Sequence, residues 1–212
     1  MKRKLIKRLI AVVAIPVVLF ASFKIENLQV YQAQTRQTTF DADEFANRFW
    51  NEKLAESIEN APDADQLLKL LNENQEAAFR QYGKKLGISK TAYFTLKGFG
   101  IIDAVNDEFI SVATIGGNTV ELETAFIFGN AVRDGSGQVN IDKFVNMTDF
   151  NKVSIAVNQL VRKKVTSHLT QAAQKGQAIE FCGMAEQKED EPFPASLRII
   201  PVKAIISDGK TE

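Results

Sequence analysis

The fold is decided by the segment YFTLKGFGIIDAVNDEFISVATIGGNTVELETAFIF, residues 93–128. Apolar and polar side chains alternate along it, and it is rich in β-branched and aromatic residues, which is the pattern of half-buried strands. Turn residues interrupt it twice, at Asn106-Asp107 and at Gly116-Gly117-Asn118. Both connections are short enough for hairpins, so we predict an antiparallel meander. Its three strands are 93–105, 109–115 and 119–128.

The third of these strands has an acidic side and an apolar side. Glu121 and Glu123 alternate with apolar residues, so we expect the acidic side to face water and the apolar side to face the core. The apolar side carries Val120, Leu122, Phe126 and Phe128.

Helical periodicity precedes the meander. Asp41 is placed to cap a helix whose apolar residues recur about every 3.6 positions until Pro62. A second helix begins near Asp63 or Asp65, and Gly83 and Gly87 end it. We predict that the two form a helical hairpin over residues 41–88.

After the meander comes a glycine-rich loop, residues 129–140, and then the longest helical pattern, with Asp149 as its expected cap. Two further strands, 178–184 and 197–206, end the chain. The order of three strands, one helix and two strands is that of the OB-fold. We therefore predict an α+β protein whose residues 89–212 form an OB-like five-stranded antiparallel barrel, packed with the helical hairpin as one domain. The alternative is an open α+β sheet.

The first 24 residues have the pattern of an export signal. Five basic residues and no acid occupy positions 1–8, and an uncharged apolar run, 9–23, follows. Leu19 or Phe20 would fall where signal peptidase requires a small residue. We therefore favour an uncleaved transmembrane anchor with its basic end in the cytoplasm and the remainder extracytoplasmic. A cleaved signal and a soluble periplasmic chain is the alternative. Residues 25–40 are expected to form a polar tether.

Composition excludes several classes of function. The chain has 212 residues, with one cysteine, Cys182, and one histidine, His168. These counts exclude an intramolecular disulfide framework, thiolate zinc clusters and multi-histidine metal sites, so we expect no metal and no cofactor. Outside positions 1–8 there are 21 basic and 26 acidic residues. This excess of acid opposes phosphate binding, so we expect no nucleic-acid partner.

Four polar residues are candidates for ligand or partner binding. Arg133 and Asp134 are adjacent, so together they could hold a pair of sugar hydroxyls or a partner's charge, or they could form a structural ion pair. Asp149 could be a ligand residue, a general base or a helix cap. Asn158 is either a binding group or a buried amide that bonds the preceding loop. Asp134 with Asp149 could also supply the two carboxyl groups of a glycoside hydrolase.

Several short motifs occur in the order expected of a known family. They are Phe40-Asp41, Phe45, Trp50, Tyr82-Gly83, Gly98-Phe99-Gly100, Gly129, Arg133-Asp134, Asp149-Phe150, Asn158 and Ile200-Pro201-Val202. On these the chain resembles the bacterial predicted periplasmic lipoproteins called domain of unknown function 2291. The resemblance implies an extracytoplasmic location and an association with sugar ABC transporters, beside which members are often encoded. Members usually carry a lipobox cysteine after the signal, which this chain lacks, so a peptide anchor would replace the lipid.

The sequence thus predicts a membrane-anchored extracytoplasmic interaction module that is not an enzyme. Its partners would be the inner membrane, through the N-terminal segment, and a protein of a carbohydrate ABC uptake system. The alternatives are a sugar receptor that uses the barrel mouth and a glycoside hydrolase. An aromatic pocket on which Arg133 and Asp134 converge would favour the receptor, whereas a filled barrel with an exposed apolar patch would favour a protein partner. The oligomeric state stays open.

Overall fold

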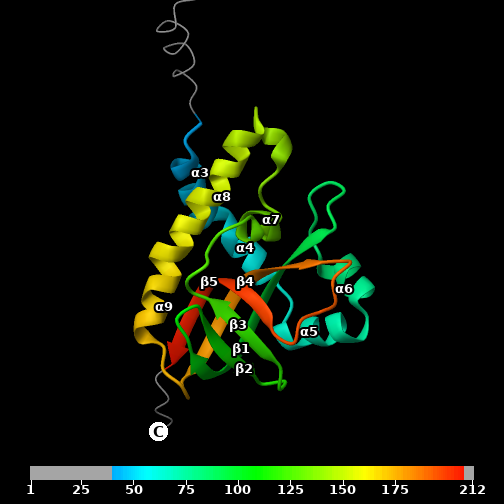
Figure 1. The fold of residues 1–212 in the computed structure, drawn as a ribbon. Coiled ribbons are helices and arrows are strands. Elements are labelled where there is room, and N and C mark those ends of the chain that lie inside the picture. Colours follow the sequence, from blue (N-terminus) through cyan, green and yellow to red (C-terminus); the bar gives the residue numbers. More distant parts are fainter. Residues whose placement is uncertain (1–39, 208–212) are drawn as a thin grey trace, which may run out of the picture. The chain divides into compact units, whose positions relative to one another are not determined.

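A barrel of five strands is the centre of the structure (Figure 1), a computed structural model that describes residues 40–207. The strands close in the order β1-β2-β3-β5-β4. The predicted OB-like barrel is therefore confirmed, and the open sheet is not what forms. The strands are β1 (Thr91–Val105), β2 (Phe109–Thr114), β3 (Thr119–Glu123), β4 (Ala178–Lys188) and β5 (Leu197–Ser207).

The longest strand, β1, joins the two sides of the barrel. It pairs with β4 from Thr91 to Ile101 and with β2 from Gly100 to Val105. The glycine is required at position 100, because a Cβ there would lie 2.3 Å from the carbonyl oxygen of Ala113. Its lack of a side chain allows β1 to turn from one neighbour to the next.

The pair that closes the barrel is parallel. β3 and β5 pair over three residues, from Val120 with Leu197 to Leu122 with Ile199. The sequence led us to expect only antiparallel pairs, because the alternation of side chains identifies a strand but not the direction of its neighbour.

The interior of the barrel is a packed core. All five strands contribute side chains with no exposed surface, so the barrel is filled. The largest of them are Phe94, Leu96, Ile102, Ile110, Leu122, Ile179, Phe181 and Ile199.

Both predicted helical arms form, the second with an additional break, but they do not pack together as a hairpin: the first arm packs mainly against the long helix at 147–172, and the second packs against β1. Asp41 accepts a hydrogen bond from the backbone N–H of Glu44 (2.9 Å), and Asp63 caps the second arm. That arm is broken at Asn74, whose side chain caps a new helix by accepting from the N–H of Ala77 (3.0 Å). The helices are α3 (Ala42–Arg48), the π-turn η1 (Phe49–Lys53), α4 (Leu54–Glu59), α5 (Ala64–Glu73) and α6 (Gln75–Tyr82).

The chain between β3 and β4 contains more helix than predicted. The expected loop at 129–140 holds the short helix α7 (Ala131–Ser136), followed by one 3₁₀ turn, η2 (Ile141–Lys143). The long helix then runs beside the barrel and packs against α3 (Figure 1). It consists of α8 (Met147–Val161), the π-turn η3 (Arg162–Thr166) and α9 (Ser167–Ala172).

The cap of α8 is not Asp149, as the sequence suggested, but Asn146. The Asn146 side chain accepts from the backbone N–H of Asp149 (2.8 Å), which lies in the first turn. Asn and Asp cap helices about equally well, so the apolar stripe alone does not locate the first turn.

The predicted anchor at 1–24 and nearly all of the tether at 25–40 lie outside the described residues. Between residues 40 and 207, no helix has the length and apolar character needed to cross a membrane.

Candidate functional site

Arg133 and Asp134 form a buried bidentate ion pair. Arg133 Nε and Nη2 donate to the two carboxylate oxygens of Asp134 at 2.6 and 2.9 Å, and the side chains are 1% and 7% exposed. Arg133 Nη1 also donates to the carbonyl oxygen of Phe150 (3.1 Å), and the guanidinium lies over the ring of Phe150 (3.6 Å to the centroid). These contacts join α7 to α8 and leave the pair with little access to solvent.

Asp149 lies at the exposed start of α8. It accepts hydrogen bonds from Lys152 Nζ (2.9 Å) and Asn146 Nδ2 (3.0 Å), and the bond from Lys152 is the main cause of its lowered pKa. A general acid needs a raised pKa. The structure gives Asp134 and Asp149 a cationic partner each, and Asp149 lacks the raised pKa of a general acid.

Asn158 is buried and bonds the loop that follows β3, one of the two roles considered for it. Its Nδ2 donates to the carbonyl oxygen of Gly129 (3.0 Å). Two neighbours on the long helix act on the same segment: Ser154 Oγ bonds Asn130 Oδ1 (2.9 Å), and Arg162 donates to the backbone carbonyl of Ile127. Three side chains thus fix the segment 127–130 against the helix.

Two aromatic rings, one within this segment and one immediately before it, are exposed to solvent. Phe126 is 50% exposed and Phe128 is 66% exposed, and the rings meet edge to face with centroids 6.4 Å apart. Ile155 of α8, 60% exposed, lines the same hollow as Phe128. We call these three residues the aromatic ridge.

A hollow lies on each side of the ridge. The first, about 310 Å³, is lined by both phenylalanines together with Glu123, Glu186 and Arg198. The second, about 280 Å³, is lined by Phe128, Ile155, Asn158 and Arg162 among others. An apolar centre with polar borders is the arrangement found at protein interfaces.

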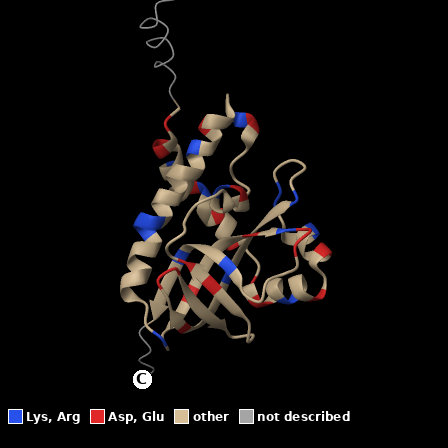
Figure 2. Ribbon diagram, viewed as in Figure 1, with Lys and Arg blue, Asp and Glu red and all other residues tan. Residues whose placement is uncertain are grey.

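The first hollow is acidic. Arg198 forms ion pairs with three carboxylates: Glu121 (3.0 Å), Glu123 (3.4 Å) and Glu108 (3.8 Å). Glu186 is exposed nearby. Over the rest of the barrel, Figure 2 shows acidic and basic residues interspersed, with no continuous basic face in this view.

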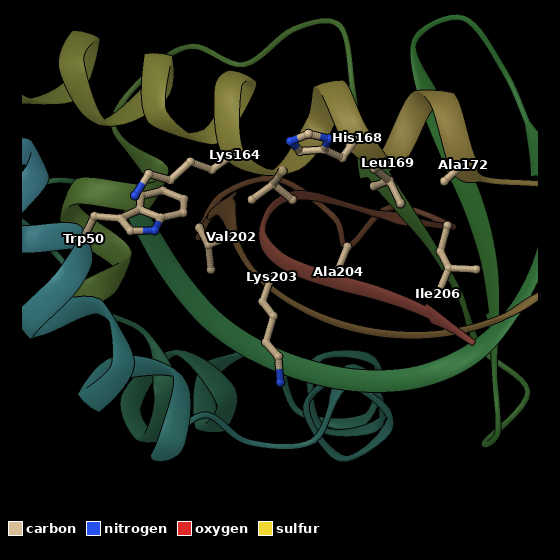
Figure 3. Close-up of a pocket in the computed structure, with 10 residues that line it drawn as sticks. Trp50, Lys164, His168, Leu169, Ala172, Val202, Lys203, Ala204 and Ile206 are labelled. Carbon is tan, nitrogen blue, oxygen red and sulfur yellow. The ribbon is translucent and has the colours of Figure 1, made fainter. Parts of the chain in front are cut away.

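A third hollow, about 440 Å³, lies between β5 and the helical segment 164–172 (Figure 3). Trp50 and Lys164 stand together at one end, with the Lys164 ammonium 5.6 Å from the centre of the indole. We call it the edge groove. Its lining residues are Trp50, Lys164, Val165, His168, Leu169, Ala172, Val202, Lys203, Ala204 and Ile206. In the described part of the chain, no cluster of three or more His, Cys, Asp or Glu could hold a metal ion.

Comparison with protein families identifies the chain. A family described as predicted periplasmic lipoprotein (DUF2291) matches residues 13–204. The protein belongs to the DUF2291 family. This membership indicates an extracytoplasmic, membrane-associated location. A search among curated proteins gave no match.

The DUF2291 protein is similar to a solved structure. A crystal structure of an OB-fold protein from Thermotoga maritima aligns with a TM-score of 0.72 and 26% sequence identity. The alignment covers 80% of this chain and 100% of that one. This similarity agrees with the barrel topology described above.

Sequence reasoning missed the ridge because it placed Phe126 and Phe128 on the core side of the third strand. β3 ends at Glu123, which is only 5% exposed and pairs with Arg198. The expectation that this side of the strand faces water is therefore also wrong at Glu123. The burial of Glu123 depends on a residue 75 positions away, and alternation cannot show it. Gly129, with φ of +79°, is a local signal that the strand ends before it.

Proposed function

We propose that this DUF2291 protein is a non-enzymatic interaction module that binds a protein partner through the aromatic ridge. The observation that supports this most strongly is the exposure of Phe126 and Phe128 on a segment held by three side chains of the long helix. Holding the segment in one conformation lowers the entropy lost when a partner binds. Aromatic residues fixed at a surface are typical energetic centres of interfaces.

The same geometry gives less support to the two alternatives. A sugar receptor that uses the barrel mouth needs space inside the barrel, but the interior is filled by apolar side chains, and Arg133 and Asp134 are buried against each other. A glycoside hydrolase needs one carboxyl with a raised pKa, whereas the pKa of Asp149 is lowered.

The location we propose is the extracytoplasmic face of the inner membrane. The basic and apolar pattern of residues 1–24 supports a peptide anchor, and the single cysteine at position 182 supports it over a lipid attached after the signal. As the partner we propose a component of a carbohydrate ABC uptake system, because the chain resembles a family whose members are often encoded beside such transporters.

The test is copurification from crosslinked membranes of the source cell. Full-length protein is compared with the double variant Phe126→Ser/Phe128→Ser and with Ile115→Ser, a matched control at another exposed apolar residue. We expect one protein to copurify with the wild type and the control and to be lost with the double variant. Equal recovery from all three proteins would reject the ridge as the binding surface.

A further inference from the structure

The barrel closes only through the first three residues of β5, and the rest of that strand has a free edge. β5 pairs with β4 along residues 200–207, but on its other side β3 pairs only with residues 197–199. Among residues 40–207, no strand covers the outer side of β5 from residue 200 onward. Backbone N–H and C=O groups on such an edge lack sheet partners and can pair with a strand from another molecule.

The edge groove runs along this open edge. η3 packs against β5, whereas the contact between α9 and β5 is weaker, and the groove lies in this region (Figure 3). Its apolar lining comes from both sides, with Val165 and Leu169 on the helix and Ala204 and Ile206 on the strand. A chain laid along β5 would meet backbone partners on one side and apolar side chains on the other.

The end of the groove at Trp50 is basic. The Lys164 ammonium lies over the indole, and within the described residues no carboxylate is in ion-pair distance of it. His168 lines the groove one helical turn further on. The other lysine, Lys203, already has a partner in Glu180 (2.6 Å). The Lys164 ammonium therefore favours a ligand that places an acidic group at this end of the groove.

We infer that the edge groove binds an extended peptide segment of a partner protein by strand addition to β5. The segment is apolar at alternate positions and carries Asp or Glu at the end beside Trp50 and Lys164. Main-chain pairing with the edge supplies affinity, and the groove selects alternate side chains, as in other strand-addition complexes. This site is separate from the aromatic ridge, so it does not depend on the function proposed above.

The test begins with a phage-displayed library of random linear peptides, selected on the full-length protein in detergent. We expect the selected peptides to alternate apolar residues, to contain Asp or Glu and to lack proline in the paired part. The inference would be overturned if the selected peptides were basic. It would also be overturned if no selected peptide depended on the groove for binding.

Two variants with matched controls then locate the site, with a selected peptide as the probe. Ala172→Trp fills the groove from an exposed helical position, and Lys164→Glu reverses its charge. Their controls are Gln171→Trp and Lys163→Glu, which are exposed neighbours that do not line the groove. We expect each groove variant to weaken binding about tenfold or more and each control to change it less than about twofold. Equal effects in variant and control would reject the site.

Two further measurements test whether the peptide binds at the ridge instead and whether the C-terminal residues of the chain fill the groove. Phe126→Ser/Phe128→Ser should bind the peptide like the wild type, and loss of binding would mean that the peptide uses the ridge instead. A chain that ends at Ser207 should also bind like the full chain. If the peptide bound the shortened chain but not the full chain, residues 208–212 would be the occupant of the groove, and the inference would be wrong.

Discussion

Arg133 has the contacts of a structural ion pair, which is one of the two roles that the sequence left open for it. Its guanidinium is paired with Asp134, bonded to the carbonyl of Phe150 and stacked on the ring of that residue. The two contacts with Phe150 join α7 to α8. These contacts therefore stabilise the region from which the ridge segment projects.

Replacement of Arg133 by methionine should cost about 3–5 kcal/mol of unfolding free energy, because the Asp134 carboxylate would remain buried without its partner. Urea denaturation of the full chain, followed by circular dichroism, measures the loss. Arg80→Met is the control, since the Arg80–Glu76 pair is exposed and contributes about 0.3–0.5 kcal/mol. A similar small loss for both variants would contradict the structural role.

At the scale of single residues, the sequence predicted some contacts and not others. One of the two roles predicted for Asn158 was a hydrogen bond to the preceding loop, and its bond to Gly129 is present. The sequence named Asp149 as a cap, but the cap is Asn146. A cap depends on which backbone N–H groups are free, and three candidate capping residues, Asn146, Thr148 and Asp149, precede the apolar stripe, so the sequence alone does not select one.

Among the elements, α8 and the segment after β3 are coupled by Asn158. Replacement of this residue by leucine removes the donor to the Gly129 carbonyl and should cost about 1–3 kcal/mol. It should also speed amide hydrogen exchange at residues 127–130, because one of the contacts that hold the segment is lost. Gln159→Leu, at the exposed neighbouring position, should change neither quantity. Unchanged exchange in Asn158→Leu would mean that the bond from Asn158 does not hold the segment.

The helix α5 is tied to the barrel by Asp65. Its carboxylate accepts hydrogen bonds from Thr114, from Asn118 Nδ2 (2.7 Å) and from the N–H of Gly116 (2.8 Å), in the turn between β2 and β3. Burial raises the pKa of Asp65, but these bonds outweigh it, and the pKa lies below its ordinary value of 3.8.

Because the folded-state pKa of Asp65 is lowered, its contribution to stability is present above pH 3.8 and is lost as the pH falls through the folded value. Asp65→Asn should therefore lower the free energy of unfolding at pH 7 and lower it less at pH 3. Urea titrations at the two pH values measure this difference. For the control Asp103→Asn, whose pair with Lys175 is exposed, the effect should be small at both values. A loss in Asp65→Asn that does not depend on pH would contradict the assignment.

At the scale of elements, periodicity predicted the order of strands and helices well. It failed where a distant residue decides the outcome. β3 ends early because the segment after it bonds to α8, and the long second helix breaks at Asn74 because an amide can cap a new helix. The parallel pairing of β3 with β5 likewise depends on the path of the whole chain.

For the whole molecule, the filled barrel predicts that sugars do not bind strongly. Thermal unfolding of the full chain against pentoses, hexoses and short oligosaccharides should show no shift with any of them. A sugar at a hundred times its Kd would add about 2.7 kcal/mol and raise the Tm by several degrees, at roughly 2–4 °C per kcal/mol. A shift confined to one sugar would contradict the proposal and support the receptor.

The most direct test of the central claim is photocrosslinking from the ridge itself, in intact cells. Phe128 is replaced by p-benzoylphenylalanine, which keeps an aromatic ring at the position, and Ile115, exposed on the turn after β2, serves as the control site. The account predicts one discrete crosslinked protein from position 128 and none from position 115. No crosslink from position 128, or the same products from both positions, would contradict it.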